Sequence, residues 1–498
     1  MGSRNFVVHV ILRMVAIFLV KLMGFFVRIP LFRALGPEGI GLYQMVYAFY
    51  GLMLTLITGG IPTALALSTA GDKQHGNRMM RRFSGYFILF GLVFSLLCYL
   101  LSDKIAHFMG NRDLEFALRC TAPAIAIVPL LSLLRGYLQG NERHGILAVS
   151  ELIEQAVRIS VLLILVLLWV HYGVSYAVGG AMLGAFSGAT LALFFVLVLL
   201  NRGTASPKRF VGHKGIPDEM SIFFYASLTI SATRLLIPFS DFLDAIIVPK
   251  RIQASGLSLV EATSMYGEIS GMGSLVVYMP SLLTSAIAFA LSTRLTSNWR
   301  SNQITAYQKH SILALEIAAL WGVGATLIMI FHATDLSLIF YSTTAASKSI
   351  QYLCLAPLLC GIREMSTIIL WASGQKKAPL IGLVLGISGS VLCNYFLIAI
   401  PGLSYTGTAM GILVLEAIAA TWNLYMIKKG FSLGLGSILM KCMALTIFVL
   451  AEIWLFRIIF SNGDHRSFLQ STGEMTLLFT TVFLYLMYRF NRSRDSIS

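Results

Sequence analysis

The sequence predicts an all-α polytopic membrane protein with about fourteen transmembrane helices. Of its 498 residues, 57% are hydrophobic and only 12% are charged, which is more apolar surface than a soluble protein of this size can bury. Apolar runs of about 20 residues recur along the chain, and a helix of that length crosses a bilayer core. The alternating ten-residue segments that are typical of a transmembrane barrel do not occur in the sequence.

Short polar segments separate the apolar runs and set the limits of the predicted helices. In chain order, the fourteen predicted spans are 8–34, 41–69, 83–102, 117–139, 146–170, 174–200, 219–247, 267–292, 308–332, 349–372, 378–400, 404–427, 437–460 and 474–489. The first run is too long for a signal peptide, and it contains Arg13, Lys21 and Arg28.

Glycine and proline are expected to interrupt three of these spans. The motif Gly59–Pro62 lies inside span two, Pro123 and Pro129 lie inside span four, and Pro280 lies inside span eight. Proline removes a backbone hydrogen bond and clashes with the preceding turn, so it kinks or ends a helix. Breaks of this kind suit helices that move, although both residues are also common in membrane helices.

The distribution of basic residues predicts the orientation of the chain. An even number of spans places both termini on one side of the membrane. If that side is the cytoplasm, the inner segments carry roughly three times as many Lys and Arg residues as the outer loops, in agreement with the positive-inside rule. The same rule explains the formal net charge of +15 without a nucleic-acid partner.

A weak internal repeat predicts two lobes. The pair Ala122-Pro123 matches Ala356-Pro357, and Gly140 matches Gly374 at the same offset, each inside a span-turn-span pattern. Such repeats are how many transporters are built. We expect residues 1–200 to form a first six-span lobe and residues 219–427 a second. The basic segment 201–218 reads as their cytoplasmic linker, and residues 437–490 hold two further spans.

The sequence offers little that suits an enzyme. It contains no HExxH or P-loop motif, and no loop is large enough for a soluble catalytic domain. The six cysteines lie inside apolar runs without CxxC spacing, which favours a role as small buried hydrophobes. We therefore expect a transporter without a metal site or a cofactor.

Cations inside the spans point to an anionic ligand. Each central charge costs roughly 2.5–3.5 kcal/mol on insertion scales, and such residues usually face a cavity or a partner. Lys21 and Arg28 share one face of span one, Arg234 lies in span seven, and Arg363 lies in span ten. With two pseudo-symmetric lobes, these cations would line a shared cavity that suits an anionic headgroup such as a diphosphate.

The remaining charges in the first lobe have a structural interpretation as well. Glu151, Glu154 and Arg158 lie on one stripe of span five, and the spacing of Glu154 and Arg158 is that of an intrahelical ion pair. Arg135 and Arg28 lie where a long side chain can reach the membrane surface.

The acids of the later spans leave alternatives open. Asp241 and Asp244 are candidates for ion coupling, but they also suit the outer surface, and Asp241 has the spacing to pair with Arg234 on the same helix. Glu316 and Glu416 are further acids inside spans nine and twelve.

Several motifs together resemble a known family. They are Lys21–Arg28, Leu35–Tyr43, Gly59–Pro62, Leu134–Gly140, Glu154–Arg158 and Tyr266–Gly271. In this order they resemble the stage V sporulation protein B-like branch of the polysaccharide transport proteins. This branch belongs to the MATE-like flippase superfamily and is related to the lipid II flippases. The resemblance extends over about residues 20–290.

The resemblance implies a fold and a function. It implies two six-helix lobes around a central cavity, with two extra helices that form a groove for a lipid tail. It also implies outward transfer of undecaprenyl-diphosphate-linked sugars across the bacterial plasma membrane. Lipid II flippases carry an arginine in span two, whereas residues 41–69 contain neither Arg nor Lys.

The leading hypothesis is a flippase for a peptidoglycan precursor such as lipid II that works by alternating access in cell-wall or spore-cortex synthesis. Its partners would be that anionic lipid, membrane lipids and cell-wall synthesis enzymes. One alternative is an exporter of another lipid-linked polysaccharide unit. A second is a cation-coupled multidrug exporter of the same fold, which would need acids where Lys21 and Arg28 stand. A third is a scaffold that does not transport.

Overall fold

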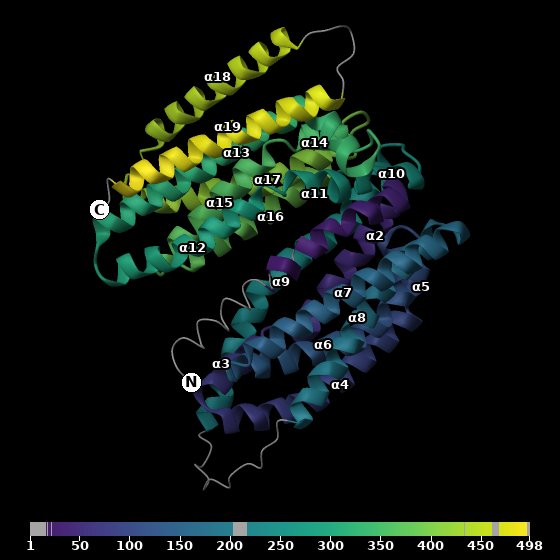
Figure 1. Ribbon diagram of the computed structural model, residues 1–498. Coiled ribbons are helices and arrows are strands. Elements are labelled where there is room, and N and C mark those ends of the chain that lie inside the picture. The colour runs from purple at the N-terminus through teal and green to yellow at the C-terminus, as the bar shows by residue number, and fades with distance from the viewer. Residues whose placement is uncertain are drawn as a thin grey trace. The chain divides into compact units, whose positions relative to one another are not determined.

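The computed structural model describes residues 16, 18–20, 22–202, 217–432, 434–460 and 468–495. Within these ranges every regular element is a helix and there is no strand, which confirms the all-α fold (Figure 1). Eight of the described helices are long and apolar enough to cross a membrane, and a bent helix pair adds a ninth. The count of fourteen spans stays a prediction.

The chain forms two compact units. The first contains Met1–Lys250 and Leu259–Gly267, and the second contains Arg251–Ser258 and Glu268–Ser498. The sequence placed the boundary at 201–218, most of which lies outside the described residues. The first unit extends further because α9 (Pro217–Ala254) is tied to it, for example by Gly60 N–H, which donates to Ser231 Oγ at 2.6 Å.

The first unit is built around α6. Besides α9, its helices are α2 (Arg28–Thr58), α3 (Ile61–Gly71), α4 (Lys73–Leu100), α5 (Ser102–Met109), α6 (Leu114–Gly140), α7 (His144–Trp169), η1 (Val170–Tyr172), α8 (Val174–Arg202) and α10 (Leu259–Tyr266). Helix α6 packs against α2, α3, α4 and α8, and α7 packs along α8 (Figure 1).

Glycines allow the closest of these helix contacts. A Cβ atom on Gly136 or Gly140 of α6 would lie 2.3 Å or 2.5 Å from the carbonyl oxygen of Pro62 or Ala66 of α3. Small residues four positions apart let membrane helices approach in this way. Both glycines are therefore required for the contact between α6 and α3.

The second unit is built around α15. Its helices are η2 (Gly267–Gly273), α11 (Ser274–Val277), α12 (Ser281–Arg300), α13 (Ile304–Tyr341), α14 (Ser347–Tyr352), α15 (Ala356–Ala372), α16 (Lys377–Leu397), α17 (Ser404–Lys428), α18 (Leu435–Ile459) and α19 (Phe468–Asp495). Helix α15 packs against α12, α13 and α17, and α16 packs along α17.

The same pattern of neighbours occurs in both units. In the first, α6 contacts α3, α4 and α8, and α7 pairs with α8; in the second, α15 contacts α12, α13 and α17, and α16 pairs with α17. The turns also correspond, because His144 begins α7 shortly after Gly140 and Lys377 begins α16 shortly after Gly374. This correspondence supports the predicted duplication.

The residues that reveal the repeat differ in local role between the copies. Pro123 lies inside α6, whereas Pro357 stands in the first turn of α15. Gly140 makes a close helix contact, whereas Gly374 has a φ of +81° and no atom within 4 Å of an added Cβ. The matched residues therefore occupy equivalent positions in the two copies of the repeat but make different structural contributions.

Two of the three expected breaks occur. Helix α2 ends at Thr58, Gly59 has a φ of 49°, and α3 begins at Ile61. Around Pro280, the helical segments Leu259–Val277 and Ser281–Arg300 meet at an angle of 51°. These observations confirm the breaks in spans two and eight.

One expectation for the first unit was wrong. Helix α6 continues through Pro123 and Pro129, since neighbouring helices can satisfy the backbone groups that a proline frees in a membrane helix.

The predicted limit between spans one and two, at residues 34–41, coincides with a sharp kink in α2. Gly36 has a φ of 66°, which glycine adopts without cost, and Pro37 then begins the next helical segment.

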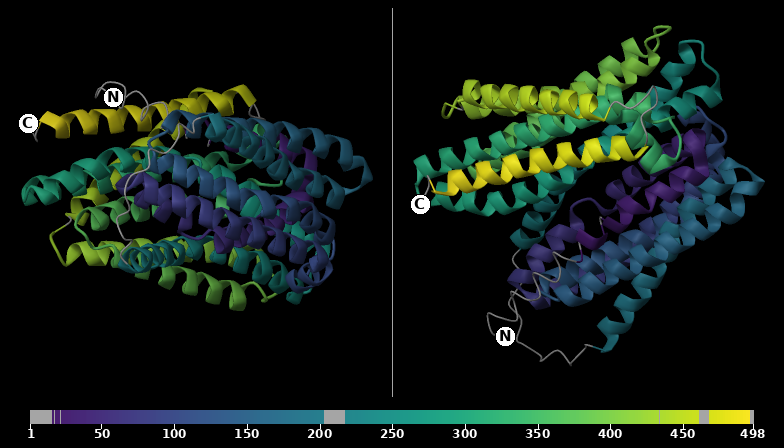
Figure 2. Two further views of the ribbon diagram at one scale, coloured as in Figure 1. Left: turned by 90° about the horizontal axis from the view of Figure 1, so that it is seen from below. Right: turned by 45° about the horizontal axis from the view of Figure 1, so that its top comes forward.

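Ion pairs hold α18 and α19 on α13. Glu316 of α13 pairs with Lys441 of α18 at 2.7 Å and with Arg489 of α19 at 2.5 Å. Glu474 of α19 also pairs with Arg457 of α18 at 3.3 Å. Figure 2 shows α19, in yellow, beside α13. The sequence singled out Glu316 but not its partners, which lie on other helices.

Candidate functional site

The first unit contains a charged cluster between α6 and α7. Glu154 of α7 accepts hydrogen bonds from Arg135 of α6 and from Arg158 of α7, each at 2.5 Å. Nε of Arg135 also donates to Ser150 Oγ at 3.1 Å. We call Arg135, Glu154 and Arg158 the α6–α7 cluster. It holds one more positive charge than negative charge.

Glycines of α8 fix the turn of α7 that carries this cluster. A Cβ on Gly188 would lie 2.4 Å from the Glu154 carbonyl oxygen, and one on Gly184 would lie 2.7 Å from the Arg158 carbonyl oxygen. The two glycines are four residues apart and so lie on one face of α8. They allow the backbone of α7 to press against α8.

The structure confirms the predicted pair of Glu154 and Arg158. It also brings Arg135 to the same carboxylate, whereas the sequence had offered a position at the membrane surface as one interpretation of this side chain. Its partner is on another helix, so no short spacing in the sequence could reveal the contact. Glu151 lies one turn before Glu154 on α7 and is half-buried.

Hydrogen-bond donors of the cluster remain available to a ligand. Nη2 of Arg135, Nε of Arg158 and the hydroxyl of Tyr50 are buried and have no hydrogen-bond partner among the described residues. Tyr50 and Tyr43 of α2 lie near Arg158. Buried polar groups are nearly always hydrogen-bonded, so this group of donors suits an oxygen-rich ligand.

Arg28 lies in the same part of the first unit. A Cβ on Gly24 would come within 3.1 Å of Gln155 Nε2, which places this turn of the chain against α7. Arg28 follows one helical turn later and lies near Tyr43. Lys21, the other predicted cation of span one, lies outside the described residues.

Arg234 and Asp241 do not form the ion pair that their spacing allowed. Both side chains are exposed on α9, and within the described part of the chain no ion pair joins them. Asp244, one turn beyond, is half-buried. The ring of Phe242 packs at 6.1 Å from that of Phe49, which holds this part of α9 against α2.

Arg363 of the second unit is paired rather than free. Its Nε donates to Glu416 of α17 at 2.5 Å, and the Tyr278 hydroxyl donates to the same carboxylate at 3.2 Å. Glu416 is only 4% exposed. The predicted cation is therefore neutralised by an acid that the sequence had identified separately.

A cavity of about 450 Å³ lies next to this pair, and both polar and apolar side chains line it. Glu364 accepts hydrogen bonds from Thr284 at 3.1 Å and from Ser285 at 2.9 Å. Arg363 and Trp371 also line the cavity. The second unit thus offers acids, whereas the first offers unpaired arginine donors.

The comparisons with known proteins agree with one another. The profile of the family described as "Polysaccharide biosynthesis protein" matches residues 6–291, which is more than half of the chain. Stage V sporulation protein B of Bacillus subtilis (strain 168) is 25% identical over 425 residues, which cover 83% of this chain and 81% of the relative. Lipid II flippase MurJ of the same organism is 24% identical over 412 residues, covering 76% of this chain and 74% of the relative.

Two solved structures share the fold. A structure of lipid II flippase MurJ aligns with a TM-score of 0.70 at 18% identity and covers 98% of this chain and 100% of that chain. A multidrug resistance MATE family transporter of the MOP superfamily aligns with a TM-score of 0.66 at 14% identity, covering 84% of this chain and 98% of that chain. At these identities the likeness establishes the fold.

Proposed function

The chain belongs to the polysaccharide biosynthesis protein family, and we propose that it moves an undecaprenyl-diphosphate-linked saccharide across the bacterial plasma membrane. The headgroup would be a peptidoglycan precursor such as lipid II, and transfer would proceed by alternating access with both termini in the cytoplasm. A role in cell-wall or spore-cortex synthesis, beside the enzymes of that synthesis, is part of the same proposal.

The α6–α7 cluster is the observation that carries this proposal. Its side chains are largely buried, with 18% of Arg135, 13% of Glu154 and 25% of Arg158 exposed. Nη2 of Arg135 and Nε of Arg158 are buried without a hydrogen-bond partner among the described residues, which is costly unless a ligand supplies acceptors. An anionic headgroup supplies such acceptors, and arginine can bind phosphate oxygens with two parallel hydrogen bonds.

The other predicted cations are part of the same proposal. We propose that Lys21, Arg28 and Arg234 contact the diphosphate during transport, because a headgroup that leaves water needs its charge offset throughout the passage. Arg363 contributes only if Glu416 releases it, since their charges cancel at 2.5 Å. Asp241, Asp244 and Glu151 stay candidates for ion coupling.

A cation-coupled exporter of the same fold is the second candidate. The observation that favours it is Glu364, a carboxylate that lines the cavity of the second unit and accepts hydrogen bonds from the hydroxyl groups of Thr284 and Ser285. Oxygen ligands of this kind suit a small hard cation. The same feature is compatible with a flippase that uses an ion gradient, so substrate class is the property to test.

Reconstitution of the whole chain in liposomes separates these functions. One set of liposomes contains lipid II and is scored for exposure of its headgroup on each leaflet; a second set contains a cationic dye under an imposed Na⁺ or H⁺ gradient. The proposal predicts headgroup exposure far above that of protein-free liposomes and no dye transport. Dye transport without movement of lipid II would establish the exporter, and movement of neither would favour a scaffold.

A further inference from the structure

We propose that the first unit carries a second, separate ligand site: a pocket for one acyl chain of an anionic phospholipid whose phosphate lies at Arg82. The pocket has a volume of about 480 Å³ and an apolar, largely aromatic lining. None of the residues of the α6–α7 cluster lines it. The pocket is therefore separate from the α6–α7 cluster.

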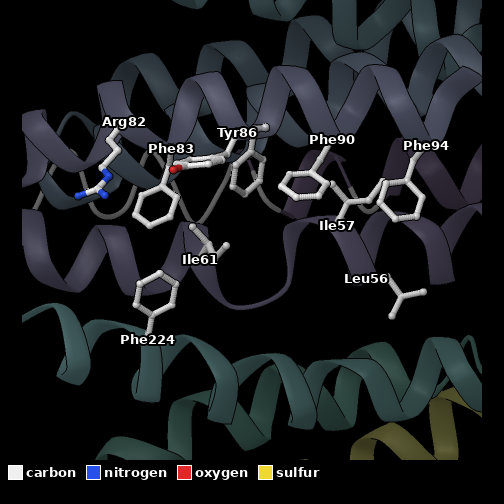
Figure 3. A pocket seen from close by; sticks show the side chains of 10 residues that line it. Leu56, Ile57, Ile61, Arg82, Phe83, Tyr86, Phe90, Phe94 and Phe224 are labelled. Atoms are coloured by element: carbon white, nitrogen blue, oxygen red, sulfur yellow. The ribbon is translucent and has the colours of Figure 1, made fainter.

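One face of α4 forms the long wall of the pocket. The residues that line it from this helix are Arg82, Phe83, Tyr86, Phe87, Phe90 and Phe94. Steps of three and four residues place them on a single stripe. Figure 3 shows Arg82 at one end of this row and Phe94 at the other. The wall is thus polar at one end and aromatic along its length.

The opposite wall is the break between α2 and α3 together with α9. Leu56, Ile57 and Ile61 flank the break, and Phe224 projects from α9 (Figure 3). The glycine at position 60 allows α9 to come close, because a Cβ there would lie 2.3 Å from the Ser227 carbonyl oxygen. Residues of four helices, α2, α3, α4 and α9, therefore line the pocket.

The length of the pocket matches one leaflet of a membrane. Arg82 and Phe94 are twelve residues apart, which corresponds to about 18 Å along a helix. Half of a hydrocarbon core of about 30 Å is about 15 Å. An acyl chain that starts at the headgroup level beside Arg82 would therefore end near Phe94. An undecaprenyl chain, at 55 carbons, is several times too long.

The charge at the open end favours an anionic headgroup. Arg82 is exposed, and no carboxylate forms an ion pair with it in the described ranges of the chain. Arg78 and Arg81 precede it on α4, so the basic end of the helix coincides with the polar end of the pocket. A lipid phosphate at this level gains charge-assisted hydrogen bonds from the guanidinium group.

Native mass spectrometry of the purified full chain tests the proposal. The delipidated protein in detergent is titrated with palmitoyl-oleoyl phosphatidylglycerol and, in parallel, with the phosphatidylcholine of the same chains. We expect one phosphatidylglycerol to be retained about tenfold more tightly than phosphatidylcholine. Arg82→Gln should abolish this preference, while Arg81→Gln removes the same charge outside the pocket and should keep it.

A second pair of variants tests whether the apolar part of the pocket holds the acyl chain. Ile57→Trp fills the pocket and should reduce retention of phosphatidylglycerol about tenfold, whereas Leu96→Trp adds the same ring to an exposed position of α4 and should not. Equal retention in Arg82→Gln, Ile57→Trp and the unmodified protein would overturn the proposal. Preferential retention of undecaprenyl phosphate would also overturn it, because the pocket would then belong to the substrate chain.

Discussion

At the scale of single residues, the shared carboxylate of Glu154 decides the charge of the candidate site. It binds the guanidinium groups of Arg135 and Arg158, and each can spare a further donor. Arg119 and Glu115 on α6 have the same one-turn spacing, but Arg119 is 46% exposed. An exposed pair of this kind contributes little to stability, so it serves as a control for the cluster.

Glu154→Gln should destabilise the protein, because it leaves two largely buried guanidinium groups without their acid. Breaking a buried pair in this way typically costs about 3–5 kcal/mol. Glu115→Gln should cost no more than about 1 kcal/mol. Thermal unfolding of both variants in the same detergent measures the difference. If the two variants unfold at the same temperature, the ion pairs of Glu154 do not stabilise the protein more than the exposed pair of Glu115 and Arg119 does.

Sequence reasoning at this scale succeeded only where partners are close in the chain. The pair of Glu154 and Arg158 follows from helical spacing alone. The contacts of Arg135 with Glu154 and of Arg363 with Glu416 depend on which helices pack together, and helix packing is set by small residues that many faces of a membrane helix share.

At the scale of helices, glycines determine how closely the site-bearing elements approach. Gly180, Gly184 and Gly188 form one stripe of α8 against α7, in the same way as two glycines of α6 face α3. The sequence shows such stripes but not the surfaces that they face. The sequence also predicted breaks in α6 at its two prolines, whereas the helix is continuous. Its continuity depends on the helices that pack against it, and the sequence does not show which helices these are.

Gly188→Ala should shift the turn of α7 that carries Glu154, because the added Cβ would lie 2.4 Å from its carbonyl oxygen. We expect a lower unfolding temperature and slower transport. Gly85→Ala is the matched control, since Gly85 lies inside α4 with no atom within 4 Å of an added Cβ. There the better helix propensity of alanine should raise stability by up to about 1 kcal/mol. We therefore expect Gly188→Ala to lower the unfolding temperature and Gly85→Ala to raise it.

Glu316→Gln should loosen α18 and α19, because it removes the common partner of Lys441 and Arg489. The unfolding temperature should fall. The triple variant that also carries Lys441→Gln and Arg489→Gln should recover most of the loss, since no uncompensated charge remains. A triple variant as unstable as Glu316→Gln would show that the charges are not the cause.

At the scale of the whole molecule, the two units share one pattern of helix neighbours. The neighbour pattern of α6 recurs around α15, and the turns after these two helices fall at corresponding places in the chain. Composition was sufficient to predict the all-α fold class, and the shared pattern of helix neighbours supports the predicted repeat. The span count and the lobe boundary stay predictions. The contact of α9 with the break between α2 and α3 could not be predicted, because it depends on packing.

Cysteine labelling tests the orientation that follows from the repeat. In a cysteine-free background, Arg143→Cys and Lys376→Cys stand in the corresponding turns and should be labelled from the cytoplasmic side. Arg112→Cys, in the turn before α6, should be labelled from outside. Labelling of Arg143→Cys and Lys376→Cys from opposite sides would refute a repeat in which both halves cross the membrane in the same direction.

The central claim is that the α6–α7 cluster receives a diphosphate, and the most direct test is the initial rate of lipid II headgroup exposure in proteoliposomes containing Arg158→Gln. Glu154 keeps its contact with Arg135 in this variant, so folding should be retained. We predict a rate at least about tenfold below that of the unmodified protein, or about 1.4 kcal/mol in activation free energy. Arg119→Gln, which removes an exposed arginine with the same pair spacing, should keep the full rate. Equal rates for Arg158→Gln and the unmodified protein, at equal amounts of reconstituted protein, would contradict the claim.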